Sequence, residues 1–206
     1  MADDSINYSN RVSLASKQGV RDPMFNSPVL APLQEFGGIL FPYMPDIQYD
    51  VRAVYDPLAL THTNYSPNIY KRTENPRISL NSVKFTASTV KDGLYMIAVM
   101  HWLRTITKMH FGVTDSKRGS PPPVLNFSAY GPTNFENVPV QVISVNYRYP
   151  SDVDYVPIKT PIGTSMVPMI LEMTMDLSVQ YSTNAIKNKF NLSDFANGTL
   201  AKQGYI

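Results

Sequence analysis

The chain has 206 residues, of which 17% are charged, and its formal net charge is +2 at neutral pH. A balance this close to neutral argues against a dedicated nucleic-acid-binding protein, which presents a strongly basic surface. The sequence contains no cysteine, which excludes disulfides, thiol chemistry and cysteine-ligated metals.

No apolar run reaches the roughly 18 residues of a membrane-spanning helix. The N-terminus lacks a basic region followed by an apolar one, so we expect a protein that stays in a cytosol-like compartment and has no membrane partner. Seventeen prolines and thirteen tyrosines are unusual in a chain of this length. Proline interrupts helices and tyrosine suits half-wet interfaces, so together they favour a mainly β protein with long ordered arms.

The first 36 residues are polar and irregular, with prolines scattered through them. We expect residues 1–36 to form an extended N-terminal arm that lies on another part of an assembly, such as a second subunit. A loose tail is the alternative. From Gly37 on, short apolar pieces broken by prolines predict strand fragments and turns, which begin a β domain over residues 37–182.

Residues 76–88 alternate between apolar and polar side chains, but the phase changes once. Ile78 and Leu80 share one register, and Val83 and Phe85 share the other. A slip of one residue predicts a β-bulge.

One helix is expected, over about residues 89–111. Its core face, at the three- and four-residue spacing of a helix, comprises Tyr95, Val99, Trp102, Ile106 and Met109. Thr89 and Asp92 suit the start of the helix, and Gly112 suits its end. We expect this helix to cover one face of a sheet.

Two strands are predicted after the helix, within residues 121–131 and 137–150, and residues 151–160 are expected to form a turn. A longer strand follows, because apolar residues alternate strictly with other residues for about 15 positions. Its predicted core face comprises Val167, Met169, Leu171, Met173, Met175, Leu177 and Val179, and continues to Tyr181.

The length of this strand favours an oligomer. Fifteen residues span about 50 Å, whereas a body of ~140 residues is roughly 37 Å across. A projecting strand with an apolar face is an aggregation hazard for a monomer, so we expect neighbouring copies of the chain to pair with it. A strongly bent strand within a single barrel is the alternative.

The opposite face of the same strand is polar. It comprises Glu172, Thr174, Asp176, Ser178 and Gln180, our candidate lumen-facing residues. If this face lined a channel, its carboxylates would repel phosphate and DNA could pass without binding, since phosphate affinity comes from Lys and Arg. An ordinary solvent-exposed face is the alternative.

Residues 183–206 are expected to form a C-terminal extension docked on the domain. Four apolar side chains could anchor it: Phe190, Leu192, Phe195 and Leu200.

No catalytic, cofactor-binding or metal-binding site is predicted. His62, His101 and His110 lack the spacing of a metal-binding helix. The loop GVTDSKRGS lacks the ending of a phosphate-binding loop. Asp152 and Asp154 could contribute to a calcium site, but no third oxygen ligand follows, and a solvated turn is the better interpretation. We therefore expect a protein that is not an enzyme.

Several blocks of the sequence resemble the tube-like baseplate proteins of contractile-tailed bacteriophages. The resemblance lies in FPYMPDIQYDVRAVYDPLALTHTNY, LRTITKMHFG, GSPPPVLNFSAYG, NVPVQVISVNYRYPSDVDYVPI and FNLSDFANGTLAKQGYI. It covers about residues 37–206, and the PPPVL and DVDY elements are its more specific parts. The resemblance implies a tail-tube fold, in which two antiparallel sheets form a sandwich or barrel with one helix at the flank.

The same resemblance implies a structural virion protein. Six copies would form a ring in the baseplate, with adjacent tube rings and the baseplate hub as partners. The lumen would hold passing DNA or a tape-measure protein. Within the family we favour a ring that initiates tube polymerisation, with a tail-tube junction protein or a bulk tube protein as alternatives. From other classes, a DNA-binding module and a hydrolase remain as hypotheses.

Overall fold

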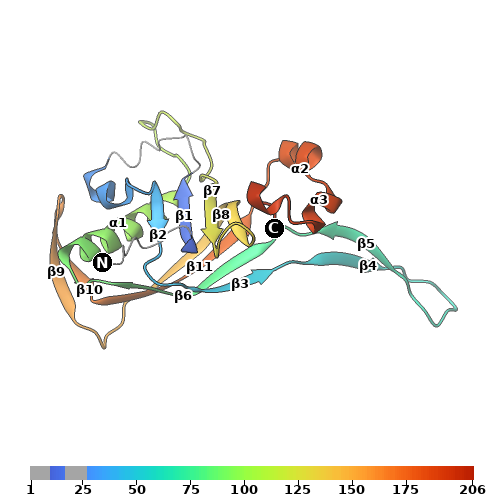
Figure 1. The fold of residues 1–206 in the computed structure, drawn as a ribbon, viewed down its shortest axis with the longest axis horizontal. Helices are drawn as coiled ribbons and strands as arrows, with labels where there is room; N and C mark the ends of the chain where they lie inside the picture. Colours follow the sequence, from blue (N-terminus) through green and yellow to red (C-terminus); the bar gives the residue numbers. More distant parts are fainter. Residues whose placement is uncertain (1–9, 17–26) are drawn as a thin grey trace, which may run out of the picture.

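The computed structural model describes residues 10–16 and 27–206, which form a mainly β protein (Figure 1). The strands are β1 Ser13–Ser16, β2 Gly38–Leu40, β3 Asp46–Asp50, β4 Ala53–Pro57, β5 Asn68–Thr73, β6 Arg77–Thr86, β7 Leu125–Ala129, β8 Phe135–Arg148, β9 Tyr155–Thr160, β10 Gly163–Pro168 and β11 Ile170–Val179. The α-helices are α1 Val90–Ile106, α2 Thr183–Lys189 and α3 Leu192–Ala196, and the 3₁₀ helices are η3 Pro28–Leu33 and η4 Ala201–Gln203.

Seven strands form one antiparallel sheet in the order β2-β1-β7-β8-β11-β6-β3. In Figure 1 the strands β1, β2 and β7 run steeply across the direction of β6 and β3, so the sheet is strongly twisted. The hairpins β4–β5 and β9–β10 form two further sheets of two strands each. The expected antiparallel β architecture is confirmed, but one large sheet stands where two sheets of a sandwich were expected.

The predicted β-bulge in residues 76–88 is confirmed. Between Leu80 and Val83 of β6 the pairing with β11 slips by one residue, since their partners are Met175 and Met173. Ser82 within the bulge has a positive φ of 51°. The extra residue returns the apolar side chains to the core, and Ile78, Leu80, Val83 and Phe85 are all buried.

The helix α1 covers the core side of the sheet. Thr89 caps its start, because its hydroxyl accepts from the Asp92 N–H while the Asp92 carboxylate accepts from the Thr89 N–H at 2.9 Å. Val99, Trp102 and Ile106 are buried. Tyr95 is partly buried, and its hydroxyl donates to the Leu40 carbonyl at 2.8 Å.

The helix ends earlier than expected, at Ile106 rather than near Phe111. Met109 therefore lies beyond it and is 49% exposed, so its assignment to the core face is wrong. The Thr107 hydroxyl donates to the Arg104 carbonyl at 3.0 Å, and Lys108 N–H returns to the Thr105 carbonyl. These local hydrogen bonds compete with the backbone hydrogen bonds that would extend α1. Gly112 lies six residues beyond the last helical residue and does not end the helix.

The long strand predicted over residues 167–181 is interrupted at Met169. β10 ends at Pro168 and pairs only with β9, whereas β11 begins at Ile170 and belongs to the large sheet. The Met169 N–H donates to the Asp154 carbonyl, and the Met169 carbonyl accepts from Ala87 N–H. Met169 is 38% exposed, so it does not belong to the core face. The other six residues of that predicted face are buried: Val167, Leu171, Met173, Met175, Leu177 and Val179.

This interruption removes the first argument for an oligomer. β11 has ten residues, and the chain itself pairs with both of its edges, through β8 and β6. Its length therefore does not require sister copies.

The described part of the N-terminal arm packs on its own domain. β1 lies between β2 and β7 in the large sheet, and Val12 and Leu14 are fully buried. Leu30 and Leu33 of η3 are also buried, beside α1. These residues of the predicted arm therefore pack within their own chain. Residues 1–9 and 17–26 of the predicted arm lie outside the described residues.

The C-terminal extension is docked, but it is helical, and of the four expected anchors only Leu200 is buried. Leu200 and Tyr205 are 4% and 5% exposed, whereas Leu192 is 71% exposed. The Tyr205 ring stacks on Tyr181 at 4.9 Å, and the Ile206 N–H donates to the Tyr181 hydroxyl at 3.0 Å. The turn expected over residues 151–160 is shorter than predicted, because β9 begins at Tyr155.

Candidate functional site

The large sheet has a polar face directed away from α1. Four of the residues predicted to share this face lie together on β11, and Gln180 follows directly after its last residue: Glu172, Thr174, Asp176, Ser178 and Gln180. Each is exposed or half-buried, in alternation with the buried core residues. Figure 1 shows the described helices above β6 and β3, with none beneath them. The face is therefore open to solvent or to a partner.

Glu172 lies between two basic side chains on this face. Its carboxylate is 3.3 Å from the Lys84 ammonium of β6 and 3.7 Å from the Arg148 guanidinium of β8. The three strands bring these residues into register, because Glu172 is paired with both Lys84 and Arg148. The negative charge of Glu172 is thus compensated from both sides.

Asp176 is held by two serines. Its carboxylate oxygens accept hydrogen bonds from the Ser144 hydroxyl of β8 and the Ser79 hydroxyl of β6, each at 2.7 Å. These two hydrogen bonds lower the pKa of the Asp176 carboxyl, with a smaller contribution from Arg77. Asp176 is therefore a fixed anion at neutral pH.

The charge of this face differs from the wall of hydroxyls and carboxylates that the β11 sequence alone suggested. Strands β6 and β8 contribute Lys84 and Arg148. The sequence of β11 alone could not show that these two residues lie beside Glu172. The face is a network of hydrogen bonds and ion pairs, and it offers phosphate neither a strongly basic nor a strongly acidic surface.

A second surface is the β4–β5 hairpin, which extends away from the body of the protein (Figure 1). Every residue of β5 is exposed, and so is all of β4 except Val54. The Tyr55 and Tyr70 rings meet edge to face at 5.7 Å on the hairpin. Lys71 and Asp56 form an ion pair across it at 2.8 Å.

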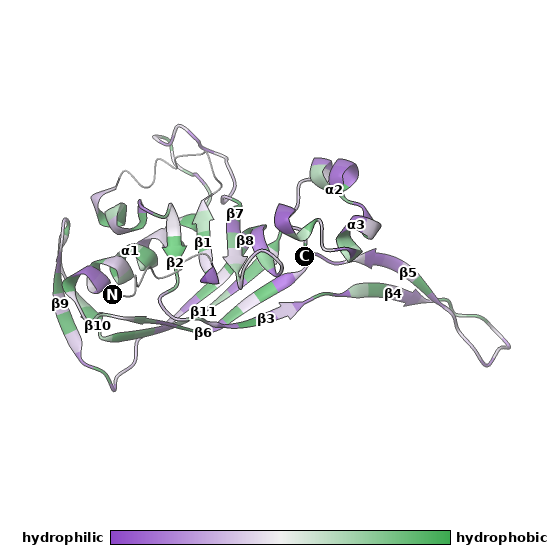
Figure 2. Ribbon diagram, in the orientation of Figure 1, coloured by the Kyte–Doolittle hydropathy of each residue, from purple (hydrophilic) through white to green (hydrophobic). Residues whose placement is uncertain are grey.

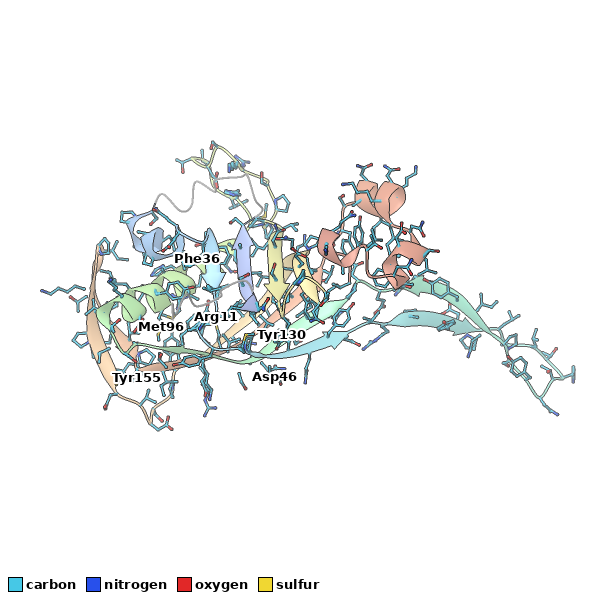
Figure 3. All side chains as sticks on the ribbon, viewed as in Figure 1. Arg11, Phe36, Asp46, Met96, Tyr130 and Tyr155 are labelled. Carbon is cyan, nitrogen blue, oxygen red and sulfur yellow. The ribbon has the colours of Figure 1, made fainter. Side chains whose placement is uncertain are left out.

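Apolar side chains on this hairpin have no core to enter. Tyr55, Ile69 and Tyr70 are each more than half exposed, and Tyr65 near the tip is 72% exposed. Figure 2 shows hydrophobic colour on the first part of β4 and hydrophilic colour at its end and over most of β5, and Figure 3 shows the side chains of the hairpin pointing outward. Exposed apolar side chains on a projecting ribbon are typical of an interaction site. Sequence reasoning treated this region as ordinary strand fragments and missed it.

A groove lies at the base of the hairpin, against the C-terminal helices. It has a volume of about 470 Å³. The apolar residues that line it and remain exposed are Val51, Ile186, Phe190, Leu192 and Phe195, and we call it the C-terminal groove. Tyr181 and Tyr205, the stacked pair that docks the extension, also line it.

The groups considered for catalysis or metal binding lie apart. His110 and Asp115 form a pair at 2.9 Å in the loop after α1, where hydrogen bonds from the Lys117 N–H and from His110 lower the pKa of Asp115. Asp152 and Asp154 are exposed in their turn. Within residues 10–16 and 27–206, no group of three or more His, Asp or Glu side chains is placed to hold a metal ion.

In the same ranges, every helix is too short or too polar to cross a membrane. No protein-family model matches the chain, and no curated protein matches it.

Proposed function

We propose that the chain is a structural, non-enzymatic virion protein of a phage baseplate, of which six copies form a tube-like ring. The ring joins the baseplate hub to the tail tube and initiates polymerisation of the tube. Its lumen provides a conduit for DNA, and the polar face of β11 lines that lumen. A mainly antiparallel β fold with one long helix across the sheet supports this proposal, together with the sequence blocks that resemble the tube-like baseplate proteins.

The observation that carries the proposal is the exposed β4–β5 hairpin. A lone chain that keeps Tyr55, Ile69 and Tyr70 in water forgoes their burial. Fully burying an aliphatic side chain such as Ile69 contributes roughly 1.5–3 kcal/mol, of which about half remains available because Ile69 is 53% exposed. Assembly with further copies or with an adjacent ring removes this surface from water. The sequence argued for an oligomer from the length of the strand predicted over residues 167–181. The exposed hairpin now provides the reason to expect one.

The ring would initiate tube polymerisation because its own strands and hairpins are ordered before the first tube subunits arrive. A ring whose strands and hairpins are already ordered presents a finished layer to the first tube subunits. Those subunits then avoid part of the cost of ordering an edge on their own.

The test is to image the purified chain by negative-stain electron microscopy and to weigh it in solution by light scattering. The proposal predicts annular particles of six copies, alone or on addition of the neighbouring ring protein. A stable dimer under all these conditions would contradict it, because a closed two-fold particle leaves no growing end.

A further inference from the structure

We infer that the C-terminal groove receives the tip of the β4–β5 hairpin of a second copy of this chain. This contact deepens the proposed ring and rests on it, because it names the surfaces through which neighbouring copies join. The tip comprises residues 58–67, between the last residue of β4 and the first of β5.

The groove suits an uncharged apolar occupant. Its exposed apolar lining comes from the hairpin base and from both C-terminal helices, at Val51, Ile186, Phe190 and Leu192. Among the described residues, Glu74 is the one charged side chain that lines it, and Glu74 is already paired with Arg72 at 3.1 Å. An entering apolar group would therefore meet no unpaired charged side chain among the described residues that line the groove.

The tip has the matching chemistry. Residues 58–67 contain no Asp, Glu, Lys or Arg, whereas the hairpin strands behind them carry Asp56, Lys71 and Arg72. Leu58, Leu60 and Tyr65 of the tip are 42%, 50% and 72% exposed. Entry of Leu58, Leu60 and Tyr65 into the groove gains the transfer energy of their exposed apolar surface. The polar side chains of the tip, at residues 61–64 and 66, must keep hydrogen-bond partners at the rim of the groove.

The tip cannot fill the groove of its own chain. The hairpin is closed by hydrogen bonds at its base, from Glu74 N–H to the Arg52 carbonyl, and at its far end, from Leu58 N–H to the Pro67 carbonyl. Six residues of extended chain between these points hold the tip roughly 20 Å from the groove. A tip that occupies this groove must therefore belong to another copy.

A contact between two different surfaces of one chain is heterologous. Each copy offers a tip to one neighbour and a groove to the other, and such contacts close into a ring or grow into a filament. Six tips in six grooves would satisfy every copy of the proposed hexamer.

The chain lacks cysteine, so cross-linking can test the contact in an otherwise native protein. A variant carrying both Leu60→Cys and Leu192→Cys is oxidised and analysed on a denaturing gel. The expected result is loss of the monomer band into a ladder of dimers, trimers and higher oligomers. The matched control carries Leu60→Cys with Val113→Cys, a residue that is 92% exposed outside the groove, and should give no such ladder.

Mixing the two single-cysteine chains, Leu60→Cys and Leu192→Cys, should give dimers and nothing larger, because each chain then offers one end. No ladder from the double variant, or an equal ladder from the control, overturns the inference. Hexameric particles without the cross-link leave the ring standing and remove this contact. A ladder without closed particles supports the contact and contradicts the ring.

Discussion

At the residue scale, Asp176 shows how the polar face is held in place. Its carboxylate joins β6, β11 and β8 through one serine on each neighbouring strand. The alternation of β11 placed Asp176 on this face, but the serines come from residues 79 and 144, far away in the sequence. Only the strand order, with β11 between β6 and β8, brings them together.

Replacement of Asp176 by Asn should lower stability in a pH-dependent manner. The lowered pKa means that the ionised carboxyl stabilises the native state above the ordinary aspartate pKa of about 3.9, and that this contribution is lost as the pH falls through the lowered value. Solvent screening reduces the loss to about 0.5–1 kcal/mol at pH 7. Urea unfolding at pH 7 and pH 3 measures it, and the difference should shrink at pH 3.

The matched control is Asp152→Asn, in an exposed turn. This substitution should leave the free energy of unfolding unchanged at pH 7 and at pH 3. An Asp176→Asn chain as stable as the wild type at pH 7 would show that the two serine bonds do not contribute.

At the element scale, α1 shows what sequence patterns determine and where they fail. Its start was predictable, because Thr89 and Asp92 form a reciprocal cap that depends only on local sequence. Its end was not, because apolar spacing continues to Met109 beyond the last helical residue. The hydroxyls of Thr105 and Thr107, bonded to the carbonyls of His101 and Arg104, mark the last turn more faithfully than Gly112 does.

Thr89→Ala should destabilise the protein by about 1 kcal/mol, because it leaves an N–H at the helix start without its capping oxygen. Thermal or urea unfolding measures the loss. Thr105→Ala, on the exposed side of the same helix, serves as control and should change stability by less than ~0.5 kcal/mol. Equal losses in the two variants would mean that the cap has no special role.

The prediction of one continuous strand over residues 167–181 is wrong for a different physical reason. Alternation reports that one face of an extended chain is buried, but it does not report which strand lies alongside. β10 pairs with β9, β11 pairs with β6 and β8, and the period of two runs through the change of partners. The bulge near Ser82 was predictable, since there the phase itself changes. Helices α2 and α3 are short, at seven and five residues, and offer too little periodicity to detect.

At the scale of the whole molecule, the unusual feature is the division between a self-contained sheet and a projecting hairpin. The sheet buries its core within one chain, so copies can associate without unfolding any part of it. The hairpin and the C-terminal groove leave apolar surface exposed, which the proposed ring would bury between copies. The open face of β11 carries compensated charge, as a wall that DNA passes without binding would require.

Charge reversal on that face should impede DNA passage through the ring. The double variant Glu172→Lys with Asp176→Lys adds two cations beside Lys84 and Arg148, so phosphate should be retained in the lumen. We expect assembly to continue and genome release from particles to slow, most strongly at low salt. The neutral pair Glu172→Gln with Asp176→Asn is the control and should release DNA at the normal rate. Unimpaired release from the charge-reversed particles would remove this face from the lumen.

The most direct test of the proposed ring is a density map of the assembled protein from cryo-electron microscopy. We expect a six-fold annulus in which the polar face of β11 lines the central channel and the β4–β5 hairpin contacts a neighbouring copy. A particle without a channel, or a ring whose channel is lined by another face, would contradict it.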